Sequence, residues 1–258
     1  MLLSTNALLA ALTASVFGGA DVRSSNISRG SVVNPDPIQT FTVGAEAEVG
    51  NNTVGARTWM CNHLTDARDN MMRRAFNEID PYLYGRNVFG MAEGWRLASE
   101  FGPAWILAPE FRDPYRSHTE VEWRVRQTLE NPFLTPYYYV RWCVHPTVLP
   151  YWMVGVQHVF TPTETVAVTP FFQTDWGSDS MFTAKYGRSS DGRYGGGLSA
   201  LTAGVRMVWR FHDNYSLYMQ AEEFALVDDE IRRCNGRRHA VNNQNERFVV
   251  TAGVAFRF

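Results

Sequence analysis

The sequence predicts an all-β protein whose antiparallel strands close into a membrane-spanning, up-and-down barrel. Three observations lead to this prediction. Polar and apolar residues alternate along most of the chain, large aromatic residues gather on the apolar face, and short connections alternate with long ones. Alternation of this kind places successive side chains on opposite faces of a strand. A chain of 258 residues is long enough for one such domain.

The composition excludes several other classes of protein. No stretch of about 20 apolar residues is present, so no helix is expected to cross the roughly 30 Å of hydrocarbon in a bilayer. Aromatic residues make up 14% of the chain, which argues against bulk disorder because these side chains need burial. A net charge of -2 gives no reason to expect binding to nucleic acid. The histidines show no metal-ligand spacing, and we expect no metal and no cofactor.

The N-terminal 20 residues are interpreted as a signal peptide. Their apolar run ends in small residues, so cleavage is expected near Ala20. The run lacks a preceding Lys or Arg, and a buried N-terminal helix is the alternative. Residues 21–38 are polar and rich in Gly, Pro and Ser, which predicts a flexible leader. The barrel is then expected to span residues 39–258.

Ten strands are expected. The alternation is sharpest over 119–128, where Val121, Trp123 and Val125 alternate with Glu and Arg, and a helix would spread these charges over its whole surface. The other predicted strands are 40–50, 54–62, 95–111, 134–145, 151–160, 164–175, 199–211, 214–227 and 247–258.

The connections of these strands sort by length. Those at 129–133, 161–163 and 212–213 are short and fall at one end of the barrel. The longer or more variable ones fall at the other end, at 112–118, 146–150, 176–198 and 228–246. This sorting is typical of transmembrane barrels and is not required of a soluble sandwich.

The segment 63–94 breaks this sorting, because the count of ten strands places it among the short turns. The spacing of its apolar residues predicts a short helix near 64–80, which Pro81 would end. Alternatively, 82–90 and 94–101 form an extra hairpin and the barrel has twelve strands. Gly102-Pro103 would then be a very tight turn, whereas in ten strands Pro103 removes a hydrogen bond in mid-strand. We prefer ten and keep twelve as the alternative.

The aromatic residues indicate which face points outward. So many indoles would overfill a small soluble interior, but they suit the lipid boundary. The indoles on the apolar face are those of Trp95, Trp105, Trp123, Trp142, Trp152 and Trp209. The opposite face carries charges of both signs and is expected to line a plugged or very narrow lumen as a paired polar network. Its members are Glu46, Glu48, Arg57, Arg96, Glu100, Glu122, Arg124, Arg126, Arg141, Arg206, Arg210 and Glu222.

The C-terminal strand carries a more specific signal. Residues 247–258 alternate strictly, and the strand ends with Phe256 and Phe258 on its apolar face. This resembles the C-terminal signature of bacterial outer-membrane β-barrels, which the barrel-assembly machinery recognises. The resemblance implies an outer-membrane location in a Gram-negative-type cell. It also implies three partners: membrane lipid, lipopolysaccharide and that machinery. We expect a non-enzymatic role, structural or as a narrow porin-like channel for an unidentified small solute.

Two other functions stay open. One is an outer-membrane enzyme with a site at the outer rim, as in omptin-type proteases, for which His145, Asp175 and Asp179 are candidates. The other is a soluble, exported ligand-binding barrel with its apolar face inward.

Two further features of the loops can be tested. Cys143 and Cys234 can form a disulfide in an oxidising compartment, with Cys61 unpaired at the opposite rim. The arginines of 228–246 either grip lipopolysaccharide phosphates or belong to a solvated loop.

Overall fold

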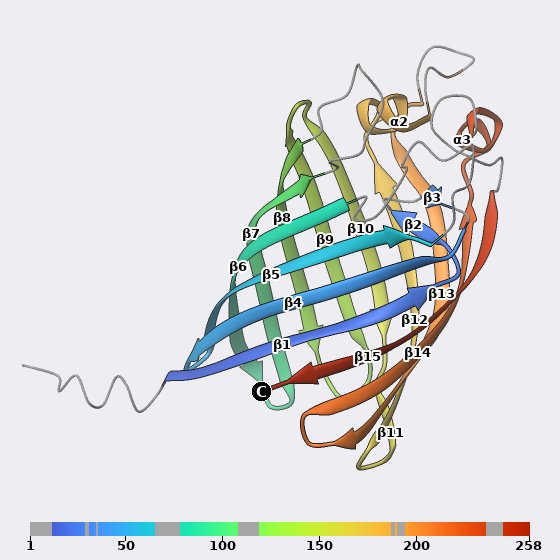
Figure 1. The fold of residues 1–258 in the computed structure, drawn as a ribbon. Coiled ribbons are helices and arrows are strands. Elements are labelled where there is room, and N and C mark those ends of the chain that lie inside the picture. Colours follow the sequence, from blue (N-terminus) through green and yellow to red (C-terminus); the bar gives the residue numbers. More distant parts are fainter. Residues whose placement is uncertain are drawn as a thin grey trace, which may run out of the picture.

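Twelve long strands form a closed antiparallel barrel (Figure 1). The computed structural model describes residues 12–28, 31–34, 36–64, 78–107, 119–186, 189, 194–235 and 245–258. The barrel closes at β1 (Leu12–Arg23), which pairs with both β15 (Glu246–Arg257) and β4 (Ile38–Val49). Closure gives every long strand two neighbours, so backbone groups find partners without water. Within the described residues, no helix is long and apolar enough to cross a membrane.

The other strands follow one another around the barrel in chain order. They are β5 (Asn52–His63), β6 (Glu78–Ala92), β7 (Trp95–Leu107), β8 (Thr119–Glu130), β9 (Thr135–His145), β10 (Leu149–Gln157), β12 (Val166–Gly177), β13 (Gly197–His212) and β14 (Tyr215–Leu226). The short β11 (Phe160–Thr163) pairs with β12 in a hairpin that projects beyond the barrel. Outside the barrel, β2 (Asn26–Ser28) pairs with β3 (Ser31–Asn34).

The expected count of ten strands is wrong, and the alternative of twelve is confirmed. The extra hairpin consists of β6 and β7, which turn at 93–94, where Gly94 has a φ of 74° that favours glycine. Pro81 and Pro103 lie within these strands rather than at a helix end or a turn. The ladder between β6 and β7 skips the residues beside both prolines, since proline has no N–H to donate. Most of the predicted helix, residues 65–77, lies outside the described residues.

The barrel starts earlier than the sequence analysis predicts. Residues 12–23, assigned above to the signal peptide and leader, form β1, and residues 26–34 contribute β2 and β3. The alternative of an N-terminal helix is also wrong for 12–20. Cleavage near Ala20 would remove most of β1, which is the strand that pairs with both β15 and β4. The error arose because the outward face of β1 consists of small and apolar residues, which resemble the apolar core of an export signal. An export signal itself stays a prediction.

With twelve strands, the connections sort by length, except that 146–148 is as short as a turn and 158–165, which includes β11, is longer than the other turns. We call one end of the barrel the turn end, where the connections are 50–51, 93–94, 131–134, 158–165 and 213–214. The opposite end is the loop end, with connections 24–37, 64–77, 108–118, 146–148, 178–196 and 227–245. The helices α2 (Asp179–Tyr186) and α3 (Asp229–Cys234) lie at the loop end (Figure 1). The predicted sorting therefore holds, and the segment 63–94 no longer breaks it.

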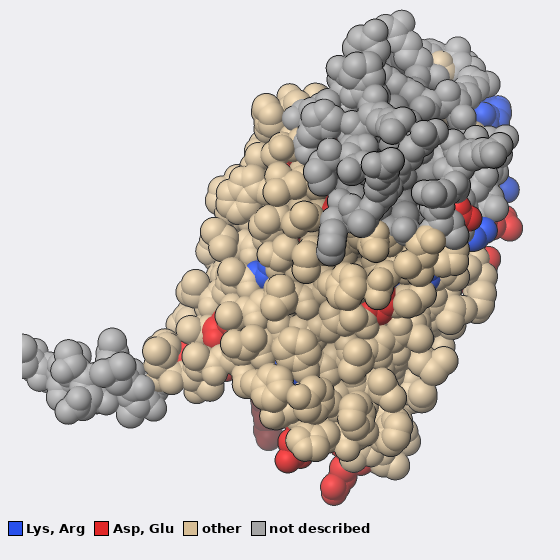
Figure 2. All heavy atoms as spheres, in the orientation of Figure 1, with Lys and Arg blue, Asp and Glu red and all other residues tan. Residues whose placement is uncertain are grey.

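The predicted orientation of the two strand faces is confirmed. Trp123, Trp142 and Trp209 are 46%, 51% and 47% exposed on the outer wall, whereas Glu122 and Arg124 are buried inside. Figure 2 shows a wall almost without charged side chains, with acidic ones gathered at the turn end. An apolar exterior suits lipid and contradicts the soluble barrel, whose apolar face would point inward.

A small apolar core caps the loop end. It joins α2 and α3 to the loop-end parts of β13 and β14, and it consists of Phe182, Tyr186, Ala200, Phe224, Leu226, Ile231 and Cys234. The Asp228 carboxylate accepts a 2.8 Å hydrogen bond from the Ile231 N–H and so caps the start of α3. The apolar core, through Ile231 and Cys234, packs α3 against β13 and β14.

Candidate functional site

The candidate site is the lumen, whose two halves differ in exposure. The loop-side half lies next to α2 and α3, and its charged side chains are nearly inaccessible: those of Asp80, Arg124 and Arg141 are 7%, 11% and 15% exposed. The turn-side half is open to solvent. There the side chains of Arg57, Arg96 and Arg257 are 38%, 65% and 55% exposed.

A buried ionic cluster of Asp80, Glu122, Arg124 and Arg141 lies in the loop-side half. Arg124 Nη2 lies 3.0 Å from Asp80 Oδ2, and Arg124 Nε lies 2.5 Å from Glu122 Oε1. Arg141 Nη2 lies 2.9 Å from the same Glu122 oxygen. Two carboxylates and two guanidiniums neutralise one another, which is the condition for burying charge. The cluster connects β6, β8 and β9 on the inner surface of the barrel.

Tyr82 connects this cluster to the turn-side half. Two guanidinium carbons lie over its ring, with Arg57 Cζ 4.9 Å and Arg124 Cζ 5.4 Å from the ring centroid. A tyrosine ring attracts a cation over its face. Arg57 also pairs with Glu100 at 3.3 Å, so one continuous series of contacts runs from the buried cluster to solvent.

Asp175 lies two residues from the loop end of β12, and it is buried. Its Oδ1 accepts hydrogen bonds from the Tyr151 hydroxyl at 2.6 Å and from Gln173 Nε2 at 2.9 Å, and the residue is 2% exposed. His145 is exposed at the end of β9, and Asp179 in α2 accepts a bond from the Tyr194 N–H at 2.7 Å. Asp175 is therefore not exposed as the predicted rim site requires, because its carboxylate is buried and hydrogen-bonded.

Three tyrosines share one arrangement. Each lies over a glycine directly opposite on the next strand and donates its hydroxyl hydrogen bond to a side chain on the strand beyond. A Cβ on each glycine would come within 2.6 Å of the tyrosine ring, so only glycine leaves room. The three sets are Tyr84, Gly55 and Glu46; Tyr137, Gly155 and Gln173; and Tyr218, Gly253 and Asp21.

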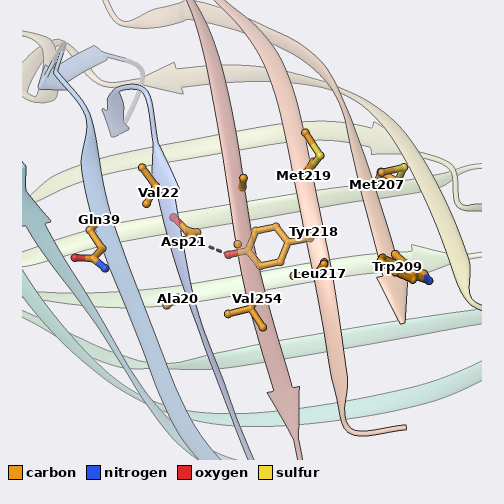
Figure 3. Close-up of a pocket in the computed structure, with 12 residues that line it drawn as sticks. Ala20, Asp21, Val22, Gln39, Met207, Trp209, Leu217, Tyr218, Met219 and Val254 are labelled. Atoms are coloured by element: carbon orange, nitrogen blue, oxygen red, sulfur yellow. Dashed lines mark hydrogen bonds between the residues drawn. The ribbon is translucent and has the colours of Figure 1, made fainter. Parts of the chain in front are cut away.

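Figure 3 shows the last of these sets beside a groove in the outer wall. Tyr218 reaches across β15 to Asp21 on β1, with 2.6 Å between the hydroxyl and Oδ2. Asp21 Oδ1 also lies 2.9 Å from Arg23 Nε. The groove of about 520 Å³ is rimmed by apolar side chains such as Met207 and Trp209. Because these side chains face lipid, the groove is part of the membrane-facing surface and not of the lumen.

The acids of the turn-side half are engaged in ion pairs. Glu130 lies 2.8 Å from Arg96 and 3.6 Å from Arg86. Arg257 pairs with Glu46 and, at 3.5 Å, with Glu48.

Three other members of the predicted network make no ion pair among the described residues. Arg126 lies over the ring of Tyr137, with 5.4 Å between Cζ and the ring centroid. Arg206 lies over Tyr218 at 4.9 Å. Arg210 donates to the Glu164 carbonyl oxygen at 2.8 Å, near the turn end.

The predicted network is thus several separate groups of contacts. Glu222 belongs to none of the ion pairs described above, and it accepts a 2.8 Å hydrogen bond from Gln220. Sequence reasoning missed the residues that complete these groups. Asp21 fell in the supposed leader, and Asp80 fell beside the supposed helix. The two-residue spacing of Tyr82 and Tyr84 places both rings on one face of a strand, and it could have indicated that β6 is a strand with side chains in the lumen.

The predicted disulfide is absent, because no bond joins the described residues Cys143 and Cys234. Cys143 Sγ lies 3.1 Å from the His145 carbonyl oxygen, and Cys234 is buried in the loop-end core, with Sγ 3.6 Å from Glu230 Oε1. Cys61 was expected at the opposite rim. With twelve strands, β5 runs from the turn end to the loop end, so Cys61 lies towards the same end as Cys143.

Comparisons with known proteins give a fold and no family. No protein-family model matches the sequence, and no curated protein matches it. Among solved structures, the COG4313 outer membrane channel from Pseudomonas putida F1 is similar at a TM-score of 0.53 and 12% identity, over 95% of each chain. The chain has the fold of outer-membrane β-barrels.

Other similar structures have different activities. The NanC porin is similar at a TM-score of 0.51 and 9% identity, over 95% of this chain and 99% of that one. Outer membrane phospholipase A from Escherichia coli is similar at 0.50 and 12% identity, over 94% and 92%. A channel, a porin and a phospholipase share this architecture, so function has to be argued from the lumen.

Proposed function

We propose that this protein is an outer-membrane β-barrel that acts as a narrow, porin-like channel for small hydrophilic solutes, without enzymatic activity. The observation that carries the proposal is the turn-side half of the lumen. A closed barrel with an apolar wall encloses charged side chains that remain accessible to water. A purely structural barrel has no need to keep these charges exposed.

The loop-side half suggests how passage is restricted. The ionic cluster, Asp175 with Tyr151, and the loop-end core occupy this half with buried side chains. We therefore expect low conductance rather than that of a wide diffusion pore. The similarity in fold to a channel and a porin agrees with this role.

Conductance across planar lipid bilayers tests the proposal. Purified, folded barrel should produce discrete steps of small amplitude, and heat-unfolded protein at the same concentration should produce none. Folded barrel that inserts into the bilayer without conducting would contradict a channel. Insertion is verified separately by heat-modifiable migration in SDS gels, since folded membrane barrels resist SDS until boiled.

The proposal includes recognition of the C-terminal strand by the barrel-assembly machinery. Phe256 and Phe258 form the end of an aromatic row, with Phe258 packed 5.6 Å from the Tyr215 ring, and they serve as the assembly signal. Replacing Phe258 with Ala should lower the folded yield in cells more than the yield of refolding in detergent. Equal losses would indicate a role in stability instead.

Lipopolysaccharide binding at the loop end is the remaining expectation. Among the described arginines there, Arg232 pairs with Glu246 at 3.8 Å and Arg233 with Glu230 at 2.6 Å. These contacts support the solvated-loop interpretation for both residues, while 236–244 lie outside the described residues.

A further inference from the structure

The inward-facing charges of the turn-side half do not balance. Its described acids are fewer than its described arginines, and each acid is already in an ion pair. The acids are Asp21, Glu46, Glu48, Glu100 and Glu130, and the arginines are Arg23, Arg57, Arg86, Arg96, Arg126, Arg206, Arg210 and Arg257. Glu222 lies further from the turn end than Gln220, which faces Arg206, and it accepts a hydrogen bond from Gln220. Glu93, Glu164 and Asp213 lie in the turns themselves. Along the strands themselves, the turn-side half therefore has more arginines than carboxylates.

Arg126 and Arg206 are held in place without being neutralised. Each is exposed, makes no ion pair among the described residues, and lies over a tyrosine ring, at 5.4 Å for Tyr137 and 4.9 Å for Tyr218. The two rings are themselves fixed by hydroxyl hydrogen bonds, of 3.0 Å to Gln173 Oε1 and of 2.6 Å to Asp21 Oδ2. Two of the three tyrosine–glycine arrangements thus support the two unpaired arginines.

Stacking leaves the donors of a guanidinium available. A ring beneath the plane contacts the face of the group, whereas the N–H bonds lie in the plane and can bind a carboxylate or phosphate. Arg126 is on β8 and Arg206 on β13, with β9, β10 and β12 between them, so they face the lumen from different sides. A solute that met both would carry more than one anionic group.

We infer that Arg126 and Arg206 form an anion-binding subsite of the channel, which takes small solutes carrying carboxylate or phosphate groups. This inference specifies the solute class and rests on the proposed function for the passage of that solute, but binding can be measured on its own.

Citrate titration of the folded barrel in neutral detergent, followed by calorimetry at low ionic strength, tests the subsite. Low salt is needed because exposed charges are screened. The variants are Arg126→Gln, Arg206→Gln, both together, and Arg126→Lys. Arg232→Gln on α3 is the matched control, because it removes the same charge outside the lumen.

Each single Gln variant should weaken citrate binding by about tenfold, as expected for loss of a charge-assisted hydrogen bond, and the pair should abolish it. Arg126→Lys should retain part of the affinity, and Arg232→Gln should leave it unchanged. Absence of citrate binding, or equal weakening by Arg232→Gln, would overturn the subsite.

Reversal potentials in planar bilayers separate this inference from the channel itself. Conducting wild type should prefer chloride over potassium, and the double variant should show a clearly smaller preference. A preference that is unchanged in the double variant would refute the subsite while leaving the channel. Arginine-dependent citrate binding without conductance would refute the channel while leaving the subsite.

Discussion

The two halves of the lumen contain the same residue types in different roles. In the loop-side half, arginine and carboxylate are buried together, and every charge in the ionic cluster depends on its neighbours. In the turn-side half, the same pairs are exposed to water, which screens them and replaces them at little cost. Burial, rather than composition, therefore decides whether an Arg–Glu pair holds the barrel together or leaves charge available to a solute.

The largest contrast is expected between Glu122 and Glu130, each of which contacts two arginines. Glu122→Ala leaves two guanidiniums without their shared partner in the buried half and should lower the free energy of unfolding by about 3–5 kcal/mol. Glu130→Ala should lower it by less than about 1 kcal/mol, because solvent compensates. Urea unfolding in lipid vesicles, followed by tryptophan fluorescence, measures both, and similar losses would show that the halves do not differ.

The next largest loss of stability is expected when the space above Gly253 is filled. A Cβ there would lie 2.6 Å from both Tyr218 Cζ and the Ala20 carbonyl oxygen, so Gly253→Val should displace the ring and cost about 1–3 kcal/mol. The matched control is Gly90→Val, because a Cβ at Gly90 meets nothing within 4 Å. Unfolding of the two variants is compared under the same conditions. A Gly90 variant that is equally unstable would point to a general intolerance of valine near the turn end.

A smaller effect is expected from the Tyr218 hydroxyl alone. Tyr218→Phe keeps the ring beneath Arg206 and removes only the bond to Asp21, which retains Arg23. The loss in unfolding free energy should be about 0.5–1.5 kcal/mol, and citrate affinity should change less than in Arg206→Gln. Tyr218→Leu, which also removes the ring, should weaken citrate binding further. If both variants bind citrate like the wild type, the ring does not position Arg206.

The smallest expected effect is that of a reductant on unfolding. Cys61, Cys143 and Cys234 are all buried and no disulfide joins them, so reductant should not alter the unfolding transition. Maleimide should label the folded barrel slowly and the urea-unfolded chain at three sites, as read by mass spectrometry. A mass two units below that of the reduced chain in non-reducing conditions would instead reveal a disulfide.

The sequence is most informative where one face of a strand meets lipid. Trp123 and its neighbours on β8 alternate so strictly that the strand, its orientation and its lumen charges follow from the pattern. The pattern is misleading where small residues replace large ones, as in β1, whose glycines and alanines fit between neighbouring strands. Pro81 and Pro103 are misleading too, because both are disfavoured in an isolated strand, whereas a long ladder tolerates a missing hydrogen bond.

The candidate site was harder to predict than the fold. Alternation assigns Arg126 and Arg206 to the lumen, but it does not show that acids elsewhere in the same half are already paired. That information depends on the register between strands, which places Tyr218 over Gly253 and brings its hydroxyl to Asp21, 197 positions away in the chain. The pattern of residues within one strand does not show which residues of other strands lie beside them.

Because β1 and β15 are paired, the barrel could keep the same strand pairings if the chain began at a different strand. Val16 and Phe258 exchange backbone hydrogen bonds of 2.9 and 2.8 Å, so the first and last strands meet side by side at the turn end. A short peptide linker there, with new termini opened at another hairpin, would preserve every pairing of the ladder. Such a circular permutant would move Phe256 and Phe258 into the interior of the chain. It would therefore separate a role of these residues in recognition during membrane insertion from a role in keeping the folded barrel closed.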